Sequence, residues 1–283
     1  DLPDEDLFEI DVNAPPASAV TPVLHGAGTM LAEHGRNPRT GDYWMLSTEA
    51  HNAAHNSEDQ HRGVFANAQL AIAATLGGPG RPTPGVIRDL DVPIGGGAKA
   101  SNTSMSAPFA MDFHSSGVCA IASSTSDLIT VVNASGVRIV DLPITQVTHP
   151  SQPQMPPQIG RAIPRDLLWD EDAATLSVYC WGWNKVLIYN INQTATPPHW
   201  LELGPDPLPV AVQEGRSIFY DAKRPVAVDQ NGAPFPGAVT CGTCHPAGGM
   251  DLLAWGLSDS VKDIKDMMVT QSLLSISDTF PYH

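Results

Sequence analysis

Two cysteines and a histidine stand together in the order Cys241-Gly242-Thr243-Cys244-His245. Two thiols at this spacing can each form a thioether with one vinyl group of a porphyrin. The histidine that follows directly can then bind the iron from one side of the ring. The C-x-x-C-H spacing therefore predicts one covalently bound haem c, with His245 as the proximal iron ligand.

The same motif allows two other interpretations, a thiol pair or half of a zinc site. A zinc site needs further cysteine or histidine ligands at matching spacing, and the sequence holds no second C-x-x-C. A thioredoxin-like motif opens a helix after a strand. Pro234, Pro236 and Gly237 precede this motif instead. We therefore favour haem attachment.

Composition limits both the fold and the partners. With 26 Pro and 24 Gly among 283 residues, the chain favours short strands joined by turns over long helices. Acidic residues outnumber basic ones 30 to 15, and the net charge of −15 argues against nucleic acid and anionic membranes as partners. It favours a redox partner protein with a basic docking face.

Haem c is attached on the outer side of an energy-transducing membrane, so the motif predicts a periplasmic or extracellular protein. No run of 18 apolar residues occurs, which predicts no membrane span. The first residues are Asp1-Leu2-Pro3-Asp4, without an initiator Met or a signal peptide, and indicate a mature or partial chain. Whether it is a subunit of a larger assembly is left open.

Short apolar strands recur over residues 1–192. Three of them start at Leu70, Leu128 and Val186, about 58 residues apart, and another strand and a turn precede each. Strands and turns at such a period are typical of the blades of a β-propeller. We therefore expect a mainly β fold, with propeller-like blades over residues 1–192.

Three stretches also resemble the blades of YVTN-type β-propellers: NPRTGDYW at 37–44, MDFHSSG at 111–117 and DLITVVN at 127–133. The pattern accounts for three nearly whole blades and the last strand of an earlier one. Because a closed propeller needs at least four blades, this domain is expected to be partial.

Other segments interrupt or end the repeat. We expect loop structure over residues 77–108, which are rich in glycine, and a linker over residues 193–209, which contain five prolines. Cys119 and Cys180 lie in predicted strands, as buried free thiols or as a disulfide. His51, His55 and His61 form either a metal site or an ordinary polar loop.

From residue 210 the sequence changes character, and we predict a small α-helical cytochrome c domain over 210–283. Residues 214–221 are expected to form a helix with Ile218 and Phe219 on its inner face. Residues 261–268 are expected to form a second helix. Phe219 and Trp255 are predicted to contribute to the haem pocket.

Several stretches of this segment resemble the haem domains of the dihaem cytochrome c peroxidase and MauG family, including cytochromes in which such a domain follows a YVTN-type propeller. They are GRSIFYD at 215–221, CGTCH at 241–245, DLLAW at 251–255, TQSLL at 270–274 and DTFPYH at 278–283. The family's second C-x-x-C-H is absent here. Because the peroxidase reaction uses two communicating haems, the resemblance does not by itself imply peroxidase activity.

The sixth iron ligand decides the chemistry of such a haem. In the related peroxidases the distal ligand comes shortly before the stretch that TQSLL resembles, which favours Met268 and then Met267. His283, Met250 and an iron without a sixth protein ligand are the alternatives. A methionine ligand favours electron transfer, and this is the function that we expect. A MauG-like haem enzyme and a binding role for the propeller are the alternatives.

Overall fold

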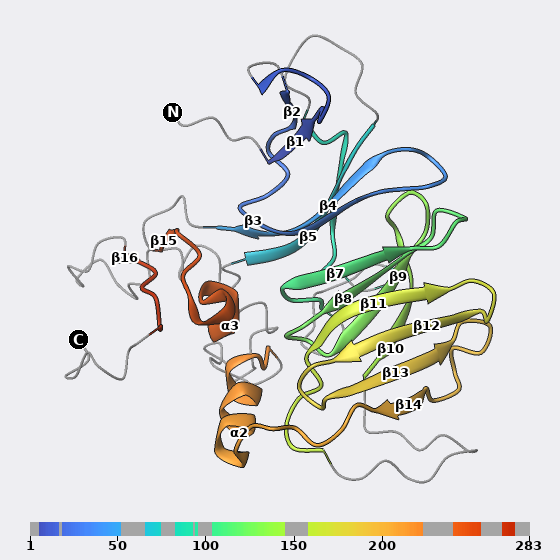
Figure 1. Cartoon of the computed structure of the whole chain (residues 1–283), viewed down its shortest axis with the longest axis vertical. Helices are drawn as coiled ribbons and strands as arrows, with labels where there is room; N and C mark the ends of the chain where they lie inside the picture. Colours follow the sequence, from blue (N-terminus) through green and yellow to red (C-terminus); the bar gives the residue numbers. More distant parts are fainter. Residues whose placement is uncertain are drawn as a thin grey trace.

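The computed structural model describes residues 6–16, 19–51, 66–74, 83–92, 94–95, 104–144, 158–222, 240–255 and 268–274. It is mainly β and contains three four-stranded antiparallel sheets, each formed by strands that follow one another in the sequence (Figure 1). We number these three sheets in chain order. No helix of the described residues is long and apolar enough to span a membrane.

The first sheet contains β3 (Met30–Arg36), β4 (Tyr43–Ala50), β5 (Ala66–Ala73) and β6 (Val86–Asp89). The second contains β7 (Pro108–Phe113), β8 (Cys119–Ser123), β9 (Leu128–Val132) and β10 (Arg138–Pro143). The third contains β11 (Pro164–Asp170), β12 (Thr175–Cys180), β13 (Lys185–Asn190) and β14 (His199–Glu202). Ahead of them, β1 (Leu7–Ile10) and β2 (Val20–Leu24) form a two-stranded sheet.

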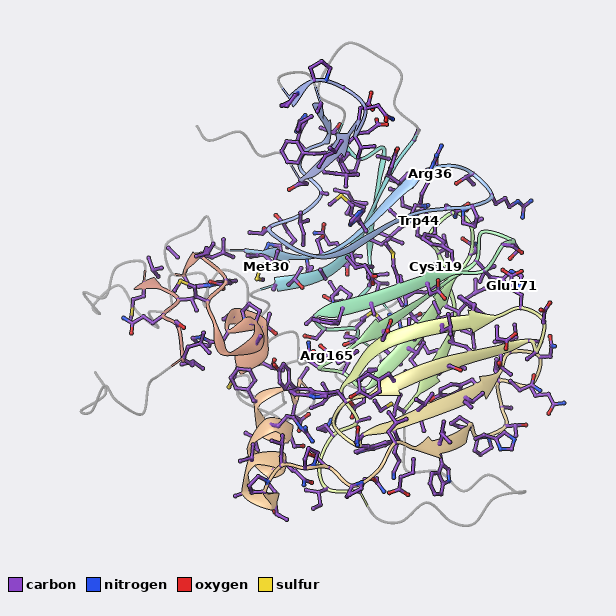
Figure 2. All side chains as sticks on the ribbon, in the orientation of Figure 1. Met30, Arg36, Trp44, Cys119, Arg165 and Glu171 are labelled. Carbon is purple, nitrogen blue, oxygen red and sulfur yellow. The ribbon has the colours of Figure 1, made fainter. Side chains whose placement is uncertain are left out.

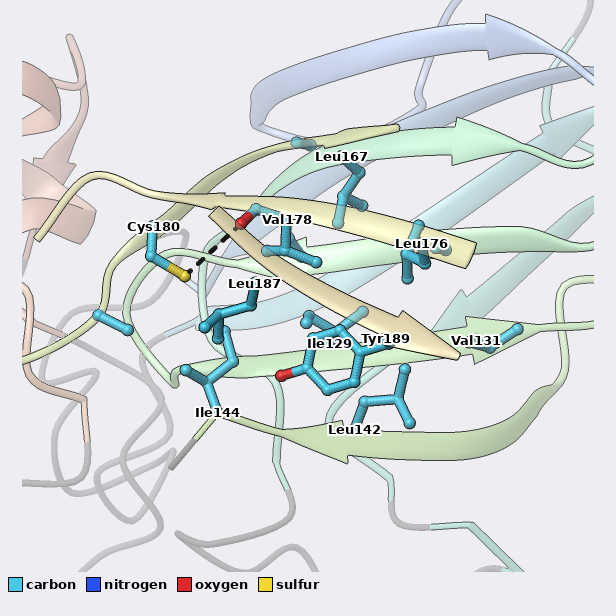
Figure 3. Close-up of a cluster of buried hydrophobic side chains, with 14 of the residues drawn as sticks. Ile129, Val131, Leu142, Ile144, Leu167, Leu176, Val178, Cys180, Leu187 and Tyr189 are labelled. Atoms are coloured by element: carbon cyan, nitrogen blue, oxygen red, sulfur yellow. Dashed lines mark hydrogen bonds between the residues drawn. The ribbon is translucent and has the colours of Figure 1, made fainter. Parts of the chain in front are cut away.

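The sheets pack face to face, with the second sheet in the middle. All five residues of β8 and all five of β9 are buried, because both faces of this sheet are covered. One apolar cluster joins the second sheet to the third, and Ile129 and Leu142 meet Leu176 and Leu187 in it (Figure 3). A second cluster joins the second sheet to the first, around Trp44. The expectation of propeller-like blades is confirmed at this level.

Carboxylates join the first strands of neighbouring sheets. An oxygen of Glu33 on β3 accepts a hydrogen bond from the backbone N–H of Met111 on β7, at 2.5 Å. Asp112 on β7 likewise accepts from the backbone N–H of Trp169 on β11, at 2.8 Å. These N–H groups lie at strand edges, where no further strand supplies an acceptor. The first strands therefore stay side by side although they are not paired as one sheet.

Two predicted irregular segments contain strands. The loop expected over 77–108 contains β6, and the linker expected over 193–209 contains β14. Both predictions are wrong for these residues. Each strand lies at the outer edge of its sheet, where few side chains are buried and prolines can flank the strand. Pro197 and Pro198 directly precede β14.

The C-terminal part holds α2 (Val210–Phe219), the one-turn helix α3 (Cys241–Cys244), a 3₁₀ turn (Pro246–Gly248) and the short strands β15 (Ala254–Trp255) and β16 (Met268–Val269). The helix predicted over 214–221 is confirmed, but its inner face is not the expected one. Ile218 is exposed and Arg216 is buried. Among the described residues of 210–283, a helical cytochrome domain is not evident.

Candidate haem-attachment site

The C-x-x-C-H motif forms a single helical turn. Thr240 and Thr243 cap it, since the Thr240 N–H donates to the hydroxyl of Thr243 at 3.1 Å and the backbone of Thr243 bonds back to Thr240. Cys241 is exposed and Cys244 is half-buried. The turn therefore presents two thiols of different accessibility, followed at once by His245.

His245 is held by a hydrogen bond that leaves one ring nitrogen for a metal. Its Nδ1 lies 3.2 Å from the carbonyl oxygen of Gly249. Because a carbonyl only accepts, Nδ1 must carry the proton, and Nε2 then has the free lone pair. Metal-binding histidines are commonly oriented in this way. The arrangement suits a proximal haem ligand.

The two thiols of the motif lie in different environments. Burial, with smaller effects of Asp251 and Cys241, raises the pKa of Cys244 to about 12. The described residues also contain no group of three or more His, Cys, Asp or Glu side chains that could hold a metal ion.

A second segment lies beside the motif. Residues 268–274 run antiparallel to 248–255, with hydrogen bonds from the N–H of Thr270 to Leu253 and from the N–H of Leu273 to Gly248. Trp255, predicted for the haem pocket, is 3% exposed, and its indole N–H donates to Asp251 at 2.9 Å. This bond fixes the tryptophan within the segment.

Apolar side chains around the motif are exposed. Leu252 is 80% exposed. Four neighbouring apolar side chains are also exposed, though less so: Met250, Met268, Val269 and Leu274. A porphyrin has apolar faces and buries such side chains when it binds. Two thiols, an oriented histidine and apolar surroundings together form a set of residues that fits haem c.

The structure places only some of the predicted distal ligands. Met268 lies in β16, opposite Trp255, while residues 261–267 of the helix expected over 261–268 lie outside the described residues. Met250 is exposed, five residues beyond His245. Met267 and His283 lie outside the described residues, so the distal ligand stays a prediction.

The other predicted sites are resolved in part. The Nε2 of His51 lies 2.9 Å from the side-chain nitrogen of Asn67, while His55 and His61 lie outside the described residues. Cys119 and Cys180 are free and buried. Of the two interpretations of these cysteines, the buried thiol is correct.

An aromatic contact that the sequence did not reveal connects the motif to the sheets. A Cβ on Gly242 would lie 2.7 Å from the ring of Tyr220 and 3.3 Å from that of Phe219. Tyr220 in turn meets Trp181 edge to face, at 5.8 Å between ring centroids. The glycine between the cysteines was the one available signal, but a glycine has many other uses.

Helix α2 is fixed to the sheets by polar contacts. Arg216 forms a buried ion pair with Asp206 and donates to the carbonyl oxygen of Gly182 at 2.8 Å. The hydroxyl of Ser217 accepts from the backbone N–H of Arg161, also at 2.8 Å. Because Tyr220 directly follows α2, these contacts also position the ring on which the motif packs.

Comparison with known proteins gives limited information. No protein-family model matches the chain, and no curated protein matches it in sequence. Among solved structures, one described as "Streptogramin B lyase structure" is similar over 62% of this chain and 55% of that chain. The identity is 12% and the TM-score is 0.30. The chain thus spans about half the length of that protein, and no functional conclusion follows from the likeness.

Proposed function

We propose that the protein is a c-type cytochrome that transfers electrons outside the cytoplasm. Cys241 and Cys244 hold one haem through thioethers, and His245 binds its iron. The single observation that supports this best is the hydrogen bond between His245 Nδ1 and Gly249, which leaves Nε2 for the metal. The haem supplies a one-electron change between ferric and ferrous iron. The protein residues hold it, orient the histidine and exclude water.

Electron transfer needs only the one haem that this motif would hold, whereas the alternative, a MauG-like or dihaem peroxidase-like enzyme, needs a second haem that is missing from this chain. Met268 is our first choice for the distal ligand and Met267 the second. A thioether in the sixth position raises the potential and closes the iron to peroxide. A basic redox protein is the partner proposed for a chain of net charge −15.

Optical and electron paramagnetic resonance spectra of the oxidised protein test this function. We expect low-spin ferric iron, a methionine–iron charge-transfer band and little turnover of peroxide. Met268→Ala should remove the band, while Met250→Ala serves as a matched control and should retain it. Met267→Ala is measured in parallel. High-spin ferric iron with rapid peroxide turnover would instead support the MauG-like enzyme.

A further inference from the structure

The first strand of each sheet carries a bulge at the same place. The pairing register shifts around Ala32 in β3, around Phe109 in β7 and around Arg165 in β11. Bulges turn a side chain away from its regular direction and often occur beside functional sites. In Figure 2, Arg165 is labelled at the end of its strand that faces the C-terminal helices, and Met30 at the same end of β3. Two of the bulged residues, Phe109 and Arg165, meet each other.

Three aromatic rings surround the guanidinium of Arg165. Its central carbon lies 4.2 Å from the ring centroid of Phe109, 4.9 Å from that of Tyr220 and 5.0 Å from that of Trp181. These rings come from the second sheet, from the residue after α2 and from the third sheet. They fix the position of the guanidinium and attract its charge. The rings cannot accept the hydrogen bonds that the five N–H groups of Arg165 donate in the plane of the guanidinium.

Among the described residues, Arg165 differs from the arginines near it in having no carboxylate partner. Arg161 pairs with Asp127 at 2.8 Å, and Arg216 pairs with Asp206. In the part of the chain that the structure describes, no carboxylate forms an ion pair with Arg165. The protein has twice as many acidic as basic residues, so the missing partner is not explained by a shortage of acids. Arg165 is half-buried and remains accessible.

From these observations we infer that Arg165 is a binding site for a carboxylate ligand, at the junction between the sheets and the C-x-x-C-H motif. The guanidinium offers two parallel N–H donors, the geometry that a carboxylate prefers. Tyr220 contacts both Arg165 and Gly242, so one ring separates the site from the motif. Two sources could supply this carboxylate. One is a propionate of the haem, and this alternative rests on the proposed function. The other is a diffusible ligand that carries a carboxylate.

The experiment compares wild type with Arg165→Gln and Arg165→Lys. Arg36→Gln is the matched control, because Arg36 also stacks on a ring, that of Tyr43 at 5.7 Å, on the other end of its strand (Figure 2). Covalent haem content, reduction potential between pH 5 and 9, and succinate binding by calorimetry are measured on each purified protein. Circular dichroism verifies folding. If Arg165→Gln unfolds, Arg165→Lys carries the test through succinate binding and the pH dependence of the potential, because lysine keeps the charge but lacks the two parallel donors.

If the haem supplies the carboxylate, Arg165→Gln keeps its covalent haem but has a lower reduction potential than wild type. The reduction potential of Arg165→Gln also varies with pH, while that of wild type does not. Removal of a nearby positive charge favours the ferric form. If the carboxylate is diffusible, wild type binds succinate, Arg165→Gln loses this binding and the potentials agree. Arg36→Gln behaves as wild type in both cases. Equal potentials and no succinate binding in any protein would overturn the site, and absence of haem would separately refute the proposed function.

Discussion

Gly242 lies directly against Tyr220, so that the ring occupies the space where any other residue would carry its Cβ. The residue between the two cysteines is therefore fixed by packing against Tyr220 and Phe219, and not by the haem motif, which accepts any residue there. The contact explains how a one-turn helix keeps a defined position: Tyr220 is itself held between Trp181 and Arg165.

Substitution of Gly242 by alanine should therefore weaken the docking of the motif. Overpacking of this kind costs about 1–3 kcal/mol, measured as the free energy of unfolding in urea. Gly215→Ala is the control, because nothing lies within 4 Å of its Cβ in α2. We expect that control to be stabilised by about 1 kcal/mol. Equal effects of the two substitutions would show that the Tyr220 contact does not form.

The buried ion pair of Asp206 and Arg216 should hold α2 on the third sheet. Burial favours the neutral acid, but the Leu208 N–H and Arg216 outweigh it and lower the pKa of Asp206. Asp206→Asn should cost about 3 kcal/mol at pH 7, because Arg216 is left unpaired. Because the pKa of Asp206 is lower in the folded than in the unfolded state, the ionised carboxylate stabilises the fold when the pH is above the unfolded-state pKa. This contribution is lost as the pH falls through the folded-state pKa.

Thermal unfolding of wild type and Asp206→Asn between pH 2 and 7 measures this effect. The difference between them should be largest at neutral pH and shrink below about pH 4. Asp172→Asn, in an exposed turn, is the control and should change stability by less than about 0.5 kcal/mol. A difference that stays constant down to pH 2 would contradict the role of the ionised pair.

Glu33 should show the opposite dependence on pH. Burial raises the pKa of Glu33, with smaller contributions from the charges of Asp166 and Asp112, and the Met111 N–H and His34 oppose this without cancelling it. The neutral form therefore stabilises the fold below the unfolded pKa, and that contribution is lost as the pH rises through the folded value. Glu33→Gln keeps an acceptor without the charge, so its stability relative to wild type should rise between pH 4 and 7.

Glu33→Ala is the comparison that isolates the hydrogen bond. It leaves the N–H of Met111 without its acceptor, which should cost about 1–3 kcal/mol at any pH. Chemical unfolding at pH 4 and pH 7 measures both variants. If Glu33→Gln is as destabilised as Glu33→Ala at pH 7, the connection between β3 and β7 depends on the charge.

The two buried thiols should be inert in the native protein. Burial raises the pKa of both Cys119 and Cys180, so neither forms the thiolate that reacts with iodoacetamide at pH 8. Mass spectrometry should find both unmodified in the native state and both modified in guanidinium chloride. A disulfide between them would instead block the reaction under denaturing conditions as well.

The sequence predicted the parts of the fold that repeat. The strands around Leu70, Leu128 and Val186 were found because buried apolar runs recur at a fixed spacing. The edge strands β6 and β14 were missed, because a strand with few buried side chains has no apolar pattern.

The candidate site was predictable only where its chemistry depends on neighbouring residues. Cys241, Cys244 and His245 are recognised from spacing alone. Arg165 and Tyr220 could not be found in this way, because their role arises from strands and helices far apart in the sequence. Met268 was expected in a helix and lies in β16.

Covalent haem attachment tests the central claim most directly. The chain is expressed in a periplasm with a haem-attachment system, and its intact mass is measured after denaturation, beside the variant with both Cys241 and Cys244 changed to alanine. We predict that wild type carries the added mass of one haem and keeps its visible absorption on a denaturing gel, while the variant has neither. A wild-type mass equal to that of the bare polypeptide would contradict the proposed cytochrome.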